Sequence, residues 1–116
     1  VDVFQVNHHG LDQSNNPILI RSLQPTVSVM NNGVTKGCGP DTFAVLKSAP
    51  SIQVMYQVHK NLRADLENNT SAEFIANLRK DCQANHIEMS VAPDGKSYSL
   101  RIPAKNHSRT FKTTSK

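Results

Sequence analysis

The alternation of strand-like and helix-like segments along residues 1–58 constrains the fold most strongly. Three short segments, at 1–6, 26–30 and 52–58, are rich in β-branched residues and alternate apolar with polar side chains, as strands do. Two helix patterns lie between them and begin at Pro17 and Pro40, because proline suits the first helical position. Since the connections are short, this β-α-β-α-β order predicts parallel strands covered by helices, and therefore an α/β fold.

The remainder of the chain predicts one more helix and a β-hairpin. Residues 60–69 are polar and are expected to form a loop. Thr70-Ser71-Ala72-Glu73 matches a capping box, and the helix that it predicts would carry one apolar stripe, formed by Phe74, Ile75, Leu78 and Cys82. Residues 86–91 and 96–102 flank the turn sequence Ala92-Pro93-Asp94-Gly95, which predicts a hairpin.

Composition bounds the class of protein. With 116 residues, of which 37% are hydrophobic, the chain is long enough for one domain with a modest core. No segment approaches the roughly 20 apolar residues of a membrane span. No targeting segment is recognisable, so the cellular location stays open. Cys38 and Cys82 lack the C-x-x-C spacing of a structural zinc site, and the sequence leaves open whether they pair.

The net charge of +4 is concentrated near the C-terminal end. The basic residues there are Arg101, Lys105, Arg109, Lys112 and Lys116, and no acidic residue follows Asp94. We expect residues 105–116 to form a basic, weakly structured tail, with contact to nucleic acid or another phosphate as the alternative role. With four Phe, two Tyr and no Trp, the chain shows no stacking platform for single-stranded nucleic acid.

Adjacent histidines at the end of the first strand-like segment are the main candidates for chemistry. His8 and His9 precede Gly10. A strand end holds an imidazole in place while glycine lets the backbone turn away, so a neutral ring nitrogen can bind a metal ion there. On local features alone, two surface or structural histidines are the more common explanation. The pattern around the pair therefore decides the interpretation.

That pattern resembles a known family. The chain opens V-D-V-F-Q-V-N-H-H-G, followed by a Ser/Asn-rich loop, a short helix over 17–23, a strand over 27–30 and then Asn31-Asn32-Gly33. This order is similar to the C-terminal portion of metallo-β-lactamase-superfamily proteins. The nearest branch includes the hydrolase-like domain of DNA-uptake competence proteins and its bacterial relatives. The resemblance covers residues 1–60 and, loosely, the hairpin at 86–102.

The resemblance implies a fold and a chemistry. The family fold is a four-layer αββα sandwich in which one or two metal ions, usually zinc, activate a water molecule for attack on an ester, amide or phosphodiester. In this branch the His-His-Gly segment supplies the last histidine ligand of the metal site. That ligand maps onto His8 or His9. We prefer His8, with His9 supporting or replacing it.

The chain also departs from the family, because the main metal-binding signature H-x-H-x-D-H is absent. A catalytic zinc takes about three protein ligands, and the histidine pair offers one or two. We therefore expect residues 1–104 to be the C-terminal half of a metallo-β-lactamase-like domain, inactive alone and completed by an N-terminal half of the same protein. Half of such a sandwich would expose an apolar sheet face, so self-association into a homo-oligomer is also expected.

Three further residues are candidates for the substrate side of the site. His59 follows the third strand-like segment as His8 follows the first, and parallel sheets bind ligands at the C-terminal ends of their strands. Asn32 and Lys36 lie in a glycine-rich loop whose backbone N–H groups and single cation suit an anion. The ordinary alternatives are a polar strand end and a plain connection. If the hydrolase interpretation fails, the second hypothesis is a non-catalytic binding module that contacts nucleic acid through the basic C-terminus.

Overall fold

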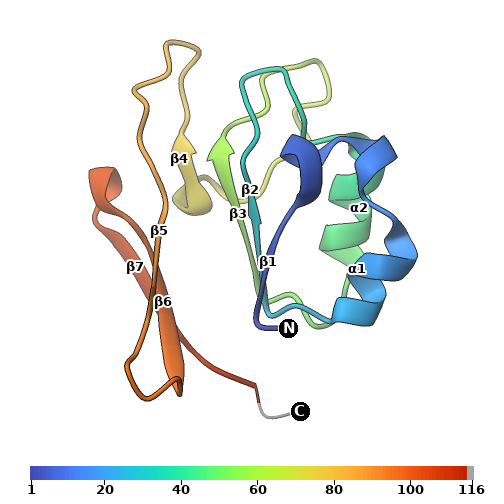
Figure 1. The fold of residues 1–116 in the computed structure, drawn as a ribbon. Coiled ribbons are helices and arrows are strands. Elements are labelled where there is room, and N and C mark those ends of the chain that lie inside the picture. Colours follow the sequence, from blue (N-terminus) through green and yellow to red (C-terminus); the bar gives the residue numbers. More distant parts are fainter. Residues whose placement is uncertain (115–116) are drawn as a thin grey trace.

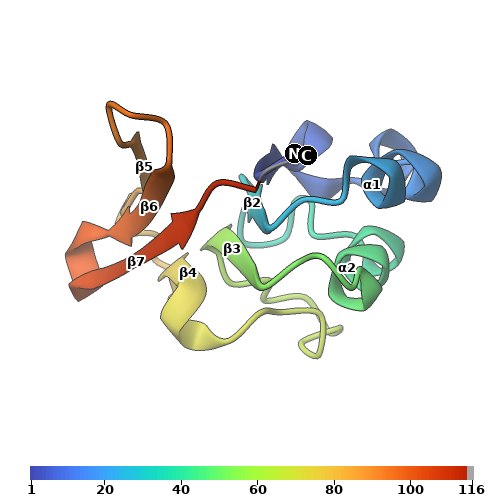
Figure 2. The same cartoon turned by 90° about the horizontal axis from the view of Figure 1, so that it is seen from below.

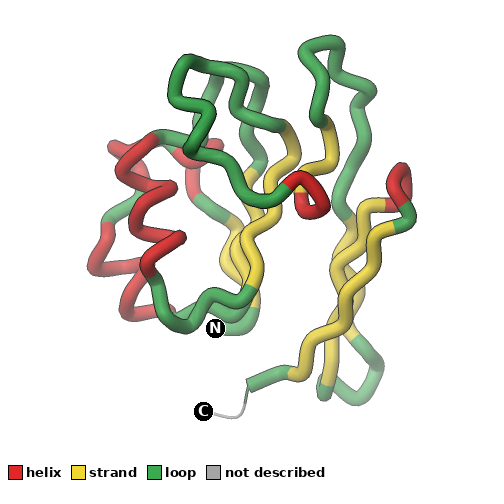
Figure 3. Tube along the Cα trace, turned by 180° about the vertical axis from the view of Figure 1, so that it is seen from behind, coloured by secondary structure: helices red, strands yellow, loops and turns green. Residues whose placement is uncertain are grey.

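The protein forms three layers of secondary structure (Figure 2). The computed structural model describes residues 1–114. A four-stranded parallel sheet lies in the middle and a three-stranded antiparallel sheet covers one of its faces. Two helices, α1 (Pro17–Leu23) and α2 (Pro40–Ser48), cover the other face. Figure 3 shows the same order of layers from behind.

The parallel sheet contains the β-α-β-α-β unit that the sequence predicts. Its strands lie side by side in sequence order and are β1 (Val3–Gln5), β2 (Val27–Met30), β3 (Val54–His59) and β4 (Ile75–Asn77). All three neighbouring pairs are parallel, and Val27 lies opposite both Val3 and Val54. The α/β fold class is therefore confirmed.

Both helices begin at the prolines that the sequence indicates. The Asn16 side chain caps α1 by accepting a hydrogen bond from the Ile18 N–H at 2.8 Å. A free N–H group in the first turn of α2 has its hydrogen-bond partner outside the helix. The Asp12 carboxylate accepts this bond from the Thr42 N–H at 2.8 Å. Over residues 1–114, no helix combines the length and apolar character that crossing a membrane requires.

The helix predicted from Thr70 onward is wrong. Ala72–Phe74 form only a short 3₁₀ turn (η3), and Ile75–Asn77 continue as β4 alongside β3. The proposed apolar stripe does not share a buried face, since Ile75 is buried whereas Leu78 and Cys82 are exposed. Without β4, β3 would be the edge strand of the sheet and would leave backbone groups unpaired. Pairing of β4 with β3 satisfies those groups, and this outweighs the local capping signal.

The C-terminal third forms the second sheet. Its antiparallel strands are β5 (Glu88–Val91), β6 (Ser97–Ile102) and β7 (His107–Lys112). The predicted hairpin is therefore confirmed, as β5 and β6. The weak structure expected for residues 105–116 does not apply to β7, because Phe111 is buried there and stacks on Tyr98 with ring centroids 5.4 Å apart. Residues 115–116 of that expected tail, including Lys116, lie outside the described residues.

Two apolar cores join the layers. The core between the helices and the parallel sheet is formed by Phe4, Val6, Ile20, Met30, Cys38, Phe43 and Leu46. The core between the two sheets is formed by Val27, Val54, Tyr56, Ala76, Tyr98, Leu100, Ile102 and Phe111. The second sheet thus covers the sheet face that half a sandwich was expected to expose. The premise for self-association through that face is wrong.

Because β7 closes the core between the sheets, we predict that Phe111→Ala lowers the free energy of unfolding by about 3–5 kcal/mol, the usual cost of removing a buried phenyl ring. Lys112→Ala, an exposed position on the same strand, is the control and should change it by no more than about 0.5 kcal/mol. Urea unfolding followed by circular dichroism measures both values. Equal effects of the two variants would show that β7 is not part of the cooperative core.

Candidate functional site

The C-terminal ends of the parallel strands meet along one edge of the sheet, the upper edge in Figure 1. β1 continues into a 3₁₀ segment, η1 (Asn7–Gly10), while loops 31–39 and 60–71 follow β2 and β3. Backbone hydrogen bonds join these segments, including one of 3.0 Å from the Cys38 N–H to the His9 carbonyl. All five predicted site residues belong to these segments or to the end of β3, namely His8, His9, Asn32, Lys36 and His59.

The two histidines adopt an uncommon backbone conformation. His8 has φ 46° and His9 has φ 58°, so both lie in the left-handed region. Side chains other than glycine occupy this region at a cost of about 1–3 kcal/mol each, and only where the surrounding structure holds them there. Such positions occur disproportionately at binding and active sites. The sequence gives no indication of this strain.

The hydrogen bonds of the two imidazole rings differ, because only the one made by His9 fixes the tautomer of its ring. His9 Nδ1 lies 2.7 Å from the Asn31 carbonyl oxygen. A carbonyl only accepts, so Nδ1 carries the proton and the Nε2 of the neutral ring keeps its lone pair. His8 Nδ1 lies 3.0 Å from Ser14 Oγ, which can donate or accept, so this contact orients the ring without fixing its tautomer. The two ring centroids are 5.7 Å apart.

Glycine is required where loop 31–39 packs against the histidine pair. Gly37 has φ 78°, and a Cβ atom there would overlap the backbone carbonyl of His9. The Gly39 N–H next donates to the Gly10 carbonyl at 2.8 Å. Loop 31–39 thus lies directly against the backbone of residues 9–10, and Gly37 permits that approach.

The predicted substrate-side residues separate into two kinds. Asn32 and His59 are buried and join the ends of β2 and β3, since Asn32 Nδ2 donates to the His59 carbonyl at 2.7 Å. The His59 Nδ1 donates to the Lys60 carbonyl at 2.8 Å, and its buried Nε2 has no hydrogen-bond partner among residues 1–114. Lys36 is exposed, and its carbonyl accepts a hydrogen bond from the Gly33 N–H at 2.9 Å. Of the three, only Lys36 presents its side chain to solvent.

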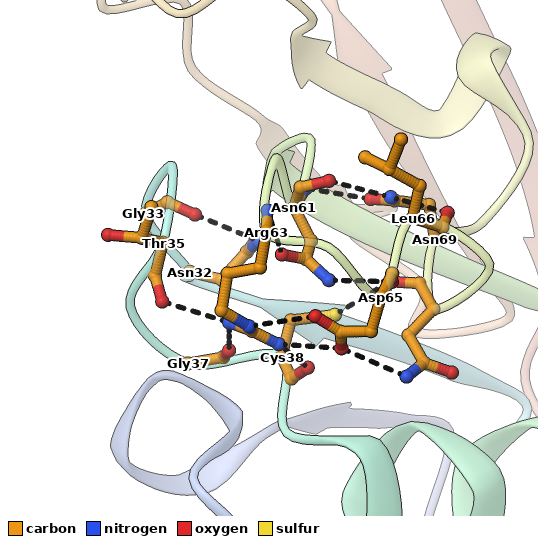
Figure 4. Close-up of polar contacts among 11 residues, drawn as sticks. Asn32, Gly33, Thr35, Gly37, Cys38, Asn61, Arg63, Asp65, Leu66 and Asn69 are labelled. Carbon is orange, nitrogen blue, oxygen red and sulfur yellow. Dashed lines mark hydrogen bonds and ion pairs between the residues drawn. The ribbon is translucent and has the colours of Figure 1, made fainter.

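Sequence reasoning missed a polar network in the loop after β3. The Asn69 side-chain amide accepts from the Asn61 N–H and donates to the Asn61 carbonyl, and the Arg63 guanidinium reaches across to loop 31–39 (Figure 4). The sequence signals of this network were the high asparagine content of residues 60–69 and the Arg-Ala-Asp sequence within them. They do not reveal which carbonyls the guanidinium contacts, because those depend on the tertiary fold.

The donor atoms at this edge suit a metal ion in kind but not in number. An imidazole Nε2 with a free lone pair is a usual zinc ligand. Among residues 1–114, however, no three His, Cys, Asp or Glu side chains are grouped so that they could hold a metal ion. The histidine pair offers two imidazole donors, and these residues do not form a complete metal site.

The cysteines do not pair and add nothing to such a site. Cys38 is buried and Cys82 is exposed, and both are free. The Cys38 thiol donates to the Asn68 carbonyl at 3.3 Å, and burial raises its pKa to about 11. A neutral, buried thiol of this kind is a poor ligand and a poor nucleophile.

Three basic residues of the C-terminal region have partners within the fold. Lys105 is used inside the fold, because its ammonium group donates to the carbonyls of Ala72 and Ile75 at 2.7 and 2.8 Å. Arg101 lies 3.7 Å from the Glu88 carboxylate, and the Arg109 guanidinium lies 5.1 Å from the centre of the Phe111 ring. The Lys105 contacts join the second sheet to η3 and β4, whereas the other two lie within the second sheet.

We predict that Gly37→Ala disrupts the histidine segment more than Gly95→Ala, although both glycines have positive φ, 78° and 69°. A Cβ at Gly95 would meet nothing within 4 Å, so that variant reports backbone strain alone, about 1–2 kcal/mol. Gly37→Ala adds the overlap with His9, for a total of about 2–5 kcal/mol. Chemical denaturation gives the energies and the His9 NMR signals give the location. Equal costs would refute the close packing of Gly37 on His9.

We also predict that a thiol reagent modifies one cysteine of the folded protein. At pH 8 the exposed Cys82 should react at once, whereas Cys38 should react only after unfolding, because it is buried and its raised pKa of about 11 leaves it protonated. Counting thiols with a chromogenic disulfide, before and after adding urea, checks this. Cys82→Ser should remove the fast reaction. Two fast thiols would contradict the burial of Cys38.

Compared with protein-family models, curated proteins and solved structures, the chain matches none of them. The resemblance to the metallo-β-lactamase superfamily therefore stays a prediction from the His-His-Gly pattern. The division into a half domain at 1–104 is likewise a prediction. The chemistry proposed for the chain rests on the geometry of the histidine pair.

Proposed function

We propose that the His8-His9-Gly10 segment is one corner of a zinc centre in a metal-dependent hydrolase. The observation that carries this proposal is the hydrogen bond from His9 Nδ1 to the Asn31 carbonyl at 2.7 Å. Histidines that bind metals donate their other ring N–H to a carbonyl or carboxylate, which fixes the tautomer and the ring orientation. His9 has this arrangement at the C-terminal end of a parallel strand, where such sheets bind ligands.

The geometry favours His9 over His8 as the ligand, in contrast to the preference from the sequence. The His9 tautomer is fixed by a carbonyl, and its ring is half-buried, which limits its motion. His8 is exposed, and its contact with Ser14 leaves both tautomers available. In this proposal His9 binds the metal, and His8 lies beside it as a second ligand or as a donor to the substrate.

The remaining ligands come, in this proposal, from polypeptide outside the 116 residues. A catalytic zinc takes about three protein ligands and keeps one position open for water. One or two zinc ions would then activate that water for attack on an ester, amide or phosphodiester. The isolated chain is expected to bind zinc weakly and to hydrolyse nothing.

The alternative of a nucleic-acid-binding module has less support. Binding of this type depends on several cations aligned along a phosphate backbone. Here Lys105 is engaged with the carbonyls of Ala72 and Ile75, and Arg101 faces Glu88. Lys36 is exposed in loop 31–39, which packs against the histidine pair, and there it suits an anionic substrate.

The proposal is tested by titrating the chain with Zn²⁺ and recording long-range ¹H–¹⁵N spectra of the imidazoles. We expect His9 to be the Nδ1–H tautomer before zinc is added, and its Nε2 signal to shift as zinc binds. His9→Ala should abolish this response and His8→Ala should weaken it. His86→Ala, an exposed histidine beside Glu88, is the matched control and should leave it unchanged.

Two results would overturn the assignment. One is a His9 ring with its proton on Nε2, because Nε2 would then have no lone pair for a metal and Nδ1 would face an oxygen that cannot donate to it. The other is a zinc response confined to histidines away from the strand ends. Tight stoichiometric zinc binding by the isolated chain would instead refute the claim that ligands are missing.

A further inference from the structure

The left-handed conformation of His8 and His9 requires a support, because each residue would otherwise relax to a commoner backbone conformation. The Asn15 side chain forms hydrogen bonds with the backbone of Asn7 and Leu11 on either side of the pair, and loop 31–39 supports His9 and Gly10. The Cys38 N–H donates to the His9 carbonyl at 3.0 Å, and the Gly39 N–H donates to the Gly10 carbonyl at 2.8 Å. Residues 37–39 therefore hold the backbone of His9 and Gly10 in place.

Loop 31–39 is in turn held by one side chain from the loop after β3. The Arg63 guanidinium donates from Nη1 to the carbonyls of Thr35 and Gly37 at 2.9 and 2.6 Å, and from Nη2 to the Cys38 carbonyl at 2.8 Å (Figure 4). Three carbonyls within four residues thus converge on one cation. A loop without regular structure is ordered in this way by charge-assisted hydrogen bonds.

The guanidinium is itself oriented by Asp65. Arg63 Nε and Nη2 each donate to one carboxylate oxygen at 3.0 Å, so all five N–H groups of the guanidinium are used. Asn68 Nδ2 donates to the same carboxylate at 3.0 Å. Hydrogen bonds from Arg63 and Asn68 hold the pKa of the Asp65 carboxyl well below its usual range, so it is charged at neutral pH.

We infer that Arg63, oriented by Asp65, is the positioning residue of the histidine corner. It fixes the carbonyls of residues 35–38, and through the Cys38 and Gly39 N–H groups it keeps His9 in the conformation that presents its Nε2. The inference rests on the proposed function only where it concerns zinc. The coupling of Arg63 to the His9 backbone is a separate statement about the fold.

The chain contains a matched control for this inference. Arg79 and Asp81 repeat the same two-residue spacing and the same paired geometry, with an Nη2–Oδ2 distance of 2.6 Å. That pair is more exposed, with side-chain exposures of 74% and 60% against 28% and 26% for Arg63 and Asp65. Among residues 1–114, Arg79 donates to Asp81 and to no loop carbonyl. A substitution of Arg79 therefore measures the effect of losing an exposed ion pair alone.

The test compares Arg63→Lys with Arg79→Lys. Lysine keeps the charge but cannot make five directed hydrogen bonds, so it should not rescue the function of Arg63. In Arg63→Lys, we expect hydrogen exchange of the Cys38 and Gly39 amides to accelerate about tenfold or more relative to the amides of β3, as local opening does. His9 should lose its single Nδ1–H tautomer, and its affinity for Zn²⁺ should fall by a similar factor. Arg79→Lys should change none of these.

The outcomes separate the inference from the proposed function. If all amides accelerate equally in Arg63→Lys, or if Cys38 and Gly39 keep their protection, Arg63 does not position the histidines. If the unmodified chain shows no zinc response at His9, the proposed function fails, and the exchange and tautomer data still decide the role of Arg63. If zinc binds the unmodified chain and Arg63→Lys equally well, the proposed function stands and the positioning role is refuted.

Discussion

The need to cover a parallel sheet on both faces governs the rest of this structure. Parallel strands are stable mainly when neither face meets water. Here α1 and α2 cover one face, and the antiparallel sheet of β5, β6 and β7 covers the other. This requirement explains why the basic C-terminal residues contribute a strand with Phe111 in the core instead of a solvated tail.

Parallel pairing also places the candidate site. Because β1, β2 and β3 run in one direction, the segments that follow them lie at one edge, although they are separated by more than 20 residues in sequence. His9, which follows β1, meets both Asn31 and Cys38 in the loop that follows β2. The backbone strain of the histidines is thus offset by contacts that exist only when the sheet has formed.

The sequence predicted those features whose signals are local. Pro17 and Pro40 mark helix starts by their own geometry, and Ala92 to Gly95 mark a turn by theirs. The segment after Thr70 carries an equally clear local signal and fails, because pairing of Ile75 with β3 is a tertiary interaction. The histidine pair was found from its pattern, but the tautomer of His9 and the role of Arg63 depend on carbonyl positions that no local pattern encodes.

Local sequence signals and tertiary contacts describe different properties of the histidine pair. A His-His-Gly sequence specifies imidazoles at a strand end, and nothing in it distinguishes a metal ligand from a surface residue. What distinguishes them is how far the ring and the backbone are fixed, because a ligand held in place loses less conformational entropy on binding. His9 is fixed at the ring by Asn31 and at the backbone by Cys38, and Arg63 fixes Cys38 in turn. If Arg63 positions His9 as we propose, a chain that kept the histidines and lost the arginine would have the same motif without its support, so the two should be assessed together.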